Sequence, residues 1–266
     1  MLSAAYEVSI LQVVEAHGKL LSAPVLPDEF LREIGRNSSS HRFLANSAQG
    51  VARRQVAFLA AVLKDHLAVL PAEIKVLDWG CGKGHITYLL RNHSFDVTSC
   101  DIVSEKNDST FGQEVPIIEQ QKITVVPLRH PSQLPFDDAS FDCVVSFGVL
   151  EHVPSDIASL HEIRRILKPG GVFYITLLPF FLSWGQAFAR LRGITYHDRL
   201  YSRSQVYALA KQARFEVVGL LHAQLFPKNS VPVGADRVLE PLDRVLCHYT
   251  PLKYFATNLE ALLVAV

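Results

Sequence analysis

The sequence predicts an α/β fold with a doubly wound parallel sheet, preceded by a helical N-terminal extension. From residue 74 onward, short apolar segments rich in β-branched residues alternate with segments of helical periodicity. Nearly continuous apolar runs are typical of buried parallel strands, and their alternation with helices is typical of βαβ units. The first run ends at Asp78 and leads into the sequence 80–84, GCGKG, which indicates a tight glycine turn between a strand and a helix.

The bulk composition limits the class of protein. The 266 residues suffice for one large domain, or for one domain with an appendage. Lys plus Arg and Asp plus Glu both number 26, so there is no basic excess that would favour a nucleic acid as partner. No segment reaches the ~18–20 apolar residues of a spanning helix. The mean hydropathy of +0.18 leaves room for an apolar pocket or for peripheral contact with a membrane.

The location expected from the sequence is the cytoplasm. The first residues show no basic segment before an apolar run, so no secretory signal is evident. The four cysteines are scattered and form neither a disulfide framework nor a C-x-x-C pair. Both features favour a reducing compartment.

Residues 1–73 are predicted to form the helical extension, and residues 74–266 the main domain. The clearest helix of the extension follows Ser47, a residue type that caps helix N-termini, and ends before Pro71. Its apolar residues keep three- and four-residue spacing as far as Leu70, as one packed face requires. Two interpretations stay open: the extension covers a ligand site, or it packs on the sheet or forms a homodimer contact.

Periodicity and turn residues place the remaining elements. Strands are predicted at 74–79, 95–100, 122–127, 141–147, 171–178, 215–222 and 258–266. Helices are predicted at 155–168, where Lys-Pro-Gly-Gly turn chemistry ends the helix, at 203–213, with Ser202 as N-cap, and around 234–247. Segment 104–120 has little periodicity, and we expect an irregular connection with room for one helical turn.

Two acidic residues limit the chemical class of ligand that the glycine turn could bind. A dinucleotide site would show G-x-G-x-x-G, whereas this chain has G-x-G-x-G with Asp78 just before it. That acid would repel a pyrophosphate but can pair with an ammonium group, which points to a ligand with an amino-acid moiety. Asp101 ends the next strand, where an acid in nucleotide-binding sheets accepts hydrogen bonds from ribose hydroxyls.

Five segments in order carry a family resemblance: VLDWGCGKG, VTSCD, LPFDDASFDCVVS, LEHVP and LKPGG. This succession resembles the class I S-adenosylmethionine-dependent methyltransferases, specifically the small-molecule kind related to the quinone-pathway enzymes. The resemblance covers residues 74 to 178. It implies a Rossmann-like, mostly parallel seven-stranded sheet with an antiparallel last strand, and S-adenosylmethionine as the cofactor.

The resemblance also implies which residues bind the cofactor. Gly80, Cys81, Gly82 and Gly84 would line its methionine part, with Asp78 near the ammonium group. Asp101 would hold the ribose and Ile102 would pack on the adenine. The sulfonium would lie above Ser146, Phe147 and Gly148. His130 stands where related sequences often carry an acid that bonds the adenine amino group, so Ser132 is an alternative contact.

The acceptor site is expected in an aromatic insertion at 179–201. Phe180, Phe181 and Trp184 could wall an apolar pocket, and Tyr196 and Tyr201 could supply polar groups. The alternative is a packed lid or a subunit contact.

Two histidines are candidates for a catalytic base: His152, which follows the fourth strand, and His197 in the insertion. The Glu-His pair at 151–152 has a purely structural alternative, in which it holds the loop. Metal-dependent quinone-pathway enzymes show E-x-x-E-H, and because Gly148 replaces the first Glu, we expect no metal.

The sequence therefore predicts a methyltransferase that acts on a small acceptor. The aromatic insertion favours an apolar or lipid-linked acceptor, and oxygen is the favoured accepting atom. One alternative is a protein that binds S-adenosylmethionine without catalysis and acts as a partner or regulator. The other, a dinucleotide-dependent oxidoreductase, is disfavoured by the glycine spacing.

Overall fold

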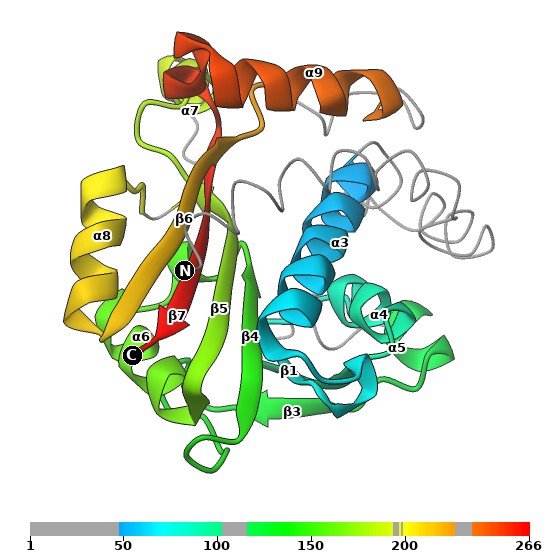
Figure 1. Ribbon diagram of the computed structural model, residues 1–266. Coiled ribbons are helices and arrows are strands. Elements are labelled where there is room, and N and C mark those ends of the chain that lie inside the picture. The colour runs from blue at the N-terminus through cyan, green and yellow to red at the C-terminus, as the bar shows by residue number, and fades with distance from the viewer. Residues whose placement is uncertain (1–47, 103–115, 194–196, 198, 227–235) are drawn as a thin grey trace.

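The computed structural model describes residues 48–102, 116–193, 197, 199–226 and 236–266 (Figure 1). The first 47 residues of the predicted extension lie outside these ranges, as does most of the predicted connection 104–120.

One mixed sheet of seven strands organises the described residues, in the order β3-β2-β1-β4-β5-β7-β6. β7 runs antiparallel to both of its neighbours, and the pairings among β1 to β5 are parallel. The predicted Rossmann-like sheet with an antiparallel last strand is thus confirmed. The strands are β1 (Lys75–Trp79), β2 (Asp96–Ile102), β3 (Val125–Leu128), β4 (Phe141–Phe147), β5 (Leu167–Pro179), β6 (Phe215–Ala223) and β7 (Asn258–Ala265).

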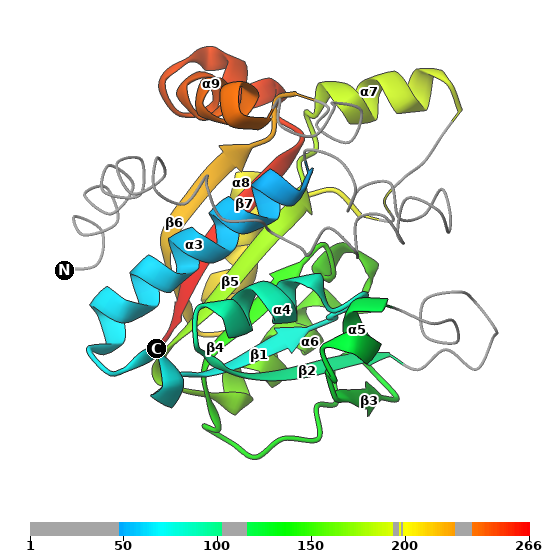
Figure 2. The ribbon, with the colours of Figure 1, turned by 90° about the vertical axis from the view of Figure 1, so that its right-hand side faces the viewer.

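Helices cover both faces of the sheet (Figure 2). α3 and α4 share one core cluster with the sheet, and α6 and α8 share the other. α7 and α9 lie together at one end of the molecule (Figure 1). The α-helices are α3 (Ala48–Leu67), α4 (His85–Asn92), α5 (Pro116–Gln120), α6 (Asp156–Ile166), α7 (Trp184–Leu191), α8 (Arg203–Gln212) and α9 (Asp236–Tyr249). Short 3₁₀ helices are η2 (Pro71–Glu73), η3 (Leu150–His152) and η5 (Pro251–Phe255).

The packing of α3 bears on the two interpretations of the extension. Leu59 and Leu63 are fully buried and share a core cluster with Val76 of β1 and Tyr174 of β5. Residues 48–67 therefore pack on the sheet. Leu70, which the spacing placed on the same face, lies beyond the end of the helix and is 69% exposed, so that assignment was wrong. The domain boundary at residue 73 stays a prediction.

One difference from the predicted elements lies at the start of β5. The strand begins at Leu167, which pairs with Phe141, and a register shift then brings Cys143 opposite Val172. Because of this bulge, the Pro-Gly-Gly segment lies inside the strand instead of ending the helix, and α6 stops at Ile166. Ser202 caps α8 as predicted. Its hydroxyl accepts a hydrogen bond from the Gln205 N–H, and the Gln205 side chain accepts one from the Ser202 N–H.

Candidate functional site

The predicted cofactor residues gather at one edge of the sheet. In register, Trp79 of β1 lies between Cys100 of β2 and Ser146 of β4. Because these strands are parallel, the segments after their carboxyl ends meet at the same edge, where the strand order reverses. The glycine turn, Asp101 and the segment from Ser146 onward are therefore neighbours.

The glycine turn has a backbone that glycine alone adopts easily. Gly80, Gly82 and Gly84 have φ of 74°, 49° and 77°. A Cβ on Gly80 would lie 2.4 Å from Cγ2 of Val149, so Val149 packs directly on the turn. A Cβ on Gly82 would meet nothing within 4 Å, so this side of the turn is open. The turn thus offers a cradle that a ligand can approach closely, which fits the amino-acid end of the expected cofactor.

Asp78 is held behind the turn by a chain of hydroxyl groups. It is 1% exposed, and its Oδ2 accepts a hydrogen bond of 2.6 Å from the Thr87 hydroxyl. Because the Thr87 hydroxyl donates its proton to Asp78, it accepts the hydrogen bond that joins it to the Ser99 hydroxyl at 2.8 Å. Burial raises the pKa of Asp78 from 3.8 to about 7. Its role at the ammonium group stays a prediction.

Thr87 was not among the predicted site residues. The available signal was its place: a hydroxyl residue in the first turn of the helix that follows a glycine turn and an acid.

Asp101 joins the second strand to the glycine turn. Its Oδ2 accepts the Gly82 N–H at 2.7 Å, and its Oδ1 accepts the Ile102 N–H at 2.6 Å. Burial raises the pKa of this carboxyl, and the two backbone donors oppose that effect. Ile102 leaves 40% of its surface exposed, so it is open to a ligand. The ribose and adenine roles of the two residues stay predictions.

The remaining residues that were predicted to bind the cofactor differ in the contacts that their side chains already make. Ser146 is fully buried, and its Oγ has no hydrogen-bond partner among the described residues. Its place beneath the sulfonium stays a prediction. Phe147 lies edge-on to Tyr174 with 6.2 Å between ring centroids. Nδ1 of His130 accepts the Ser132 N–H at 3.2 Å, and this pair closes its own turn. Cys81 is buried, which raises its pKa.

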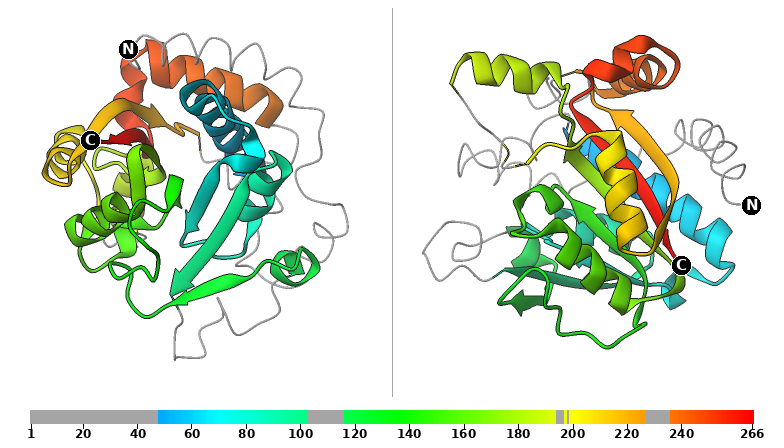
Figure 3. Two further views of the ribbon diagram at one scale, coloured as in Figure 1. Left: turned by 60° about the horizontal axis from the view of Figure 1, so that its bottom comes forward. Right: turned by 90° about the vertical axis from the view of Figure 1, so that its left-hand side faces the viewer.

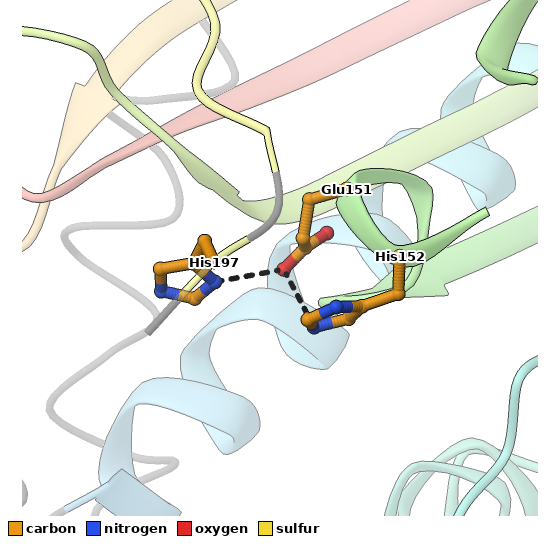
Figure 4. Close-up of side chains that lie close together, drawn as sticks. All are labelled: Glu151, His152 and His197. Atoms are coloured by element: carbon orange, nitrogen blue, oxygen red, sulfur yellow. Dashed lines mark ion pairs between the residues drawn. The ribbon is translucent and has the colours of Figure 1, made fainter. Parts of the chain in front are cut away.

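The structure brings the two predicted bases together around one carboxylate (Figure 4). Glu151 in η3 is 2% exposed, and its Oε1 lies 3.7 Å from Nε2 of His152 and 3.7 Å from Nδ1 of His197. The two imidazole centroids are 6.0 Å apart. Sequence reasoning treated the histidines separately and gave Glu151 no role of its own. We call these three residues the Glu151 cluster.

The Glu151 cluster has two chemical capacities. A buried carboxylate beside an imidazole fixes which ring nitrogen carries the proton and leaves the other to accept one. The three side chains also place one ligand atom each within 4.8 Å of one another, which is a donor set for a divalent ion. The expectation that the chain binds no metal stays a prediction.

The predicted acceptor residues divide into core and surface. Phe180 is 2% and Tyr201 1% exposed, and both belong to a core cluster with strands of the sheet. The Tyr201 hydroxyl donates to the carbonyl of Leu150 at 3.2 Å. Phe181 and Trp184 are 46% and 39% exposed. Tyr196 lies outside the described residues. Direct contact with an acceptor is therefore easier for Phe181 and Trp184 than for the two core residues.

Comparison with known proteins identifies the family. The sequence model of the methyltransferase domain matches residues 48–220, which is more than half of the chain. The chain belongs to the methyltransferase domain family. The predicted family and its cofactor, S-adenosylmethionine, are confirmed.

The curated relatives match over a limited part of their length. An uncharacterized methyltransferase of Schizosaccharomyces pombe is 33% identical over 36% of this chain and 37% of its own. A ubiquinone biosynthesis O-methyltransferase of Histophilus somni is 29% identical, over 42% and 48%. A sterol 4-C-methyltransferase of Caenorhabditis elegans is 28% identical, over 40% and 31%. The chain thus matches less than half the length of each of these relatives.

Solved structures support the fold. A methyltransferase from Thermotoga maritima superimposes with a TM-score of 0.53 at 16% identity, over 89% of this chain and 98% of the other. A methyltransferase from Methanosarcina mazei gives 0.52 at 19% identity, over 77% and 97%. At these identities the likeness concerns architecture alone.

Proposed function

We propose that the protein transfers a methyl group from S-adenosylmethionine to a small, apolar or lipid-linked acceptor, with oxygen as the favoured accepting atom. One observation carries the proposal: Val149 packs on Gly80 of the glycine turn, and Glu151 follows it by two residues. The Glu151 cluster is thereby anchored beside the cofactor cradle. The names of the ubiquinone and sterol relatives support an apolar acceptor, and the sterol enzyme makes carbon the competing atom.

Different residues of the cradle would hold different parts of the cofactor. The open backbone at Gly82 would hold the amino-acid end, Asp101 the ribose and Ile102 the adenine. When bound, S-adenosylmethionine supplies an electrophilic methyl group for in-line displacement and leaves as S-adenosylhomocysteine. Much of the remaining work of the protein is to orient the acceptor, which contributes roughly 7–11 kcal/mol in favourable cases.

The Glu151 cluster supplies a base for an acceptor hydroxyl. His197 turns Nδ1 toward Glu151, so a proton on Nδ1 directed at the carboxylate leaves Nε2 to take the acceptor's proton. His152 turns Nε2 toward the same oxygen and would use Nδ1. Since the His197 side chain is 26% exposed and that of His152 49%, His197 is better shielded from water and is our first choice.

The first experiment is calorimetry with S-adenosylmethionine. We expect binding by the wild type and a loss of at least about tenfold for Asp101→Asn, which removes a charged acceptor of hydrogen bonds. Absence of binding by the wild type would refute the proposal.

The second experiment measures release of S-adenosylhomocysteine with a panel of apolar phenols, catechols and carbon acceptors. His197→Ala is expected to lower kcat by about 10²-fold or more on hydroxyl acceptors. His161→Ala, at an exposed position of α6, is the matched control and should keep wild-type activity. Cofactor binding with no methylated acceptor across the panel would instead favour the non-catalytic partner or regulator.

A further inference from the structure

α7 carries its apolar side chains on the side that faces away from the protein. Trp184, Phe188 and Leu191 are 39%, 49% and 86% exposed, and their spacing of four and three places them in one stripe. The buried residues of the helix, Gln186 and Ala189, lie on the opposite side. An ordinary surface helix has the reverse arrangement, with its apolar stripe toward the core.

α9 repeats this inverted arrangement. Its buried side chains, Asp243 and Cys247, lie on the opposite side of the helix from its exposed stripe. Successive members of the stripe are four, three and four residues apart, and their exposed fractions are 71%, 45%, 50% and 69%; they are Val238, Leu242, Val245 and Tyr249. Two separate helices with the same inversion indicate a surface built to be covered.

Two hydrogen bonds through Leu225 link the two helices into one surface. The Trp184 Nε1–H donates to the carbonyl of Leu225 at 2.7 Å, and the N–H of Leu225 donates to Asp243 on α9 at 2.7 Å. Figures 1 and 2 and the right-hand view of Figure 3 place α7 and α9 at the same end of the molecule.

η5 continues the surface beside α9. Leu252, Tyr254 and Phe255 are 44%, 48% and 53% exposed. Tyr254 stacks edge-on against His222, with 5.6 Å between ring centroids, and His222 in turn meets Phe180 of the insertion at 4.7 Å. We call the exposed apolar residues of α7, α9 and η5 the apolar platform.

The charges around the apolar platform have a basic excess. Residues 184–192 and 236–255 hold five basic residues, Arg190, Arg192, Arg237, Arg244 and Lys253, and three acidic ones, Asp236, Glu240 and Asp243. Asp243 is 4% exposed and accepts backbone N–H groups. Two cations lie on apolar members of the platform: Arg192 is 4.3 Å from the ring centroid of Phe188, and Lys253 is 5.4 Å from that of Tyr254. The platform thus pairs apolar side chains with positive charge.

We propose that the apolar platform docks on the surface of a lipid bilayer that contains anionic lipids. Exposed aromatic and aliphatic stripes flanked by Arg and Lys are the composition of interfacial helices, and anionic headgroups complement the charge. A second copy placed face to face would bring two surfaces of the same net charge against one another, which disfavours a dimer through this surface. None of the helices in the described ranges is long and apolar enough to cross a membrane, so the contact is peripheral.

The test is flotation of the full chain with vesicles of phosphatidylcholine alone, or with about one third phosphatidylglycerol. We expect binding to the anionic vesicles that weakens as salt is raised. The double variants Phe188→Glu/Leu191→Glu and Val245→Glu/Tyr249→Glu should lower the partition coefficient by at least about tenfold. Leu70→Glu, an equally exposed apolar residue between α3 and η2, is the matched control and should bind as the wild type.

Three results would overturn the docking proposal. The first is a wild type that does not bind anionic vesicles. The second is that both double variants bind these vesicles as tightly as the wild type. The third is that the wild type forms a dimer without lipid and that Val245→Glu/Tyr249→Glu dissociates this dimer. Unchanged thermal unfolding and unchanged calorimetry with S-adenosylmethionine show that the variants are folded. The idea that docking presents an acceptor held in the bilayer rests on the proposed function. Vesicle binding itself is measured without any methyl transfer. The docking proposal can therefore fail while the proposed function stands, and the reverse.

Discussion

Replacing Asp78 with asparagine should remove a pH-dependent loss of stability from the protein. Burial raises the pKa of Asp78 from 3.8 to about 7 in the folded state. Below pH 3.8 the carboxyl is protonated in both states, and above about pH 7 it is ionised in both. Between these values the folded state holds a proton that the unfolded state has released, so the stability of the wild type falls as pH rises through this window.

The magnitude follows from the same two values. At about 1.4 kcal/mol per pH unit, the interval from 3.8 to about 7 corresponds to about 4 kcal/mol. Asparagine does not titrate, and its side-chain oxygen can still accept the hydrogen bond from Thr87. The stability of Asp78→Asn relative to the wild type should therefore rise by up to about 4 kcal/mol from about pH 4 to pH 7.

Urea unfolding at several pH values between about 4 and 8 measures this difference. Asp96→Asn, at an exposed position of β2, is the matched control for the loss of a carboxylate. If the difference between Asp78→Asn and the wild type is constant to within about 1 kcal/mol over the window, the raised pKa of Asp78 is refuted.

The same titration is linked to cofactor binding. An ammonium group attracts the ionised carboxylate and not the neutral acid. If Asp78 meets the ammonium of S-adenosylmethionine, the affinity of the wild type should rise as pH increases toward 7 and above, and Asp78→Asn should lack this rise. Calorimetry on both proteins decides the point: parallel pH profiles would place the ammonium elsewhere.

Other substitutions probe separate parts of the structure. Gly80→Ala puts a methyl group 2.4 Å from Val149 at a φ of 74°, and should cost roughly 2–4 kcal/mol in urea unfolding; a loss below about 0.5 kcal/mol would contradict this packing. Ser202→Ala removes one half of the capping box and should cost about 1 kcal/mol, seen as a fall of a few degrees in Tm. EDTA should leave methyl transfer unchanged; a loss that zinc or magnesium restores would assign a metal to the Glu151 cluster.

The sheet could be predicted because its signals are local. Each parallel strand is a short apolar run, and β4 was placed at its observed bounds, 141–147. The start of β5 could not be placed in this way. Gly170 adopts a φ of 75° inside the strand, and the bulge that this permits depends on pairing with Phe141 of β4, a contact that no local pattern contains.

The cofactor edge was predictable for a similar reason, whereas the Glu151 cluster was not. Asp78, the glycine turn and Asp101 each end or follow a strand, and parallel strands bring such positions to one edge. His197 reaches Glu151 because the insertion returns to the sheet at an isolated bridge between Phe180 and Tyr201. That bridge also buries both aromatic rings, and an aromatic-rich sequence does not itself distinguish core from pocket wall.

The insertion therefore connects the two surfaces that we propose act on the acceptor. Its ends are fixed to the sheet by the bridge between Phe180 and Tyr201, α7 between them carries the outward apolar stripe, and His197 lies on the returning stretch beside Glu151. An acceptor held in a bilayer would meet α7 before it meets His197. Damage to the stripe should then raise KM for acceptors embedded in vesicles and spare water-soluble analogues of the same acceptor, whereas damage to His197 should lower kcat for both.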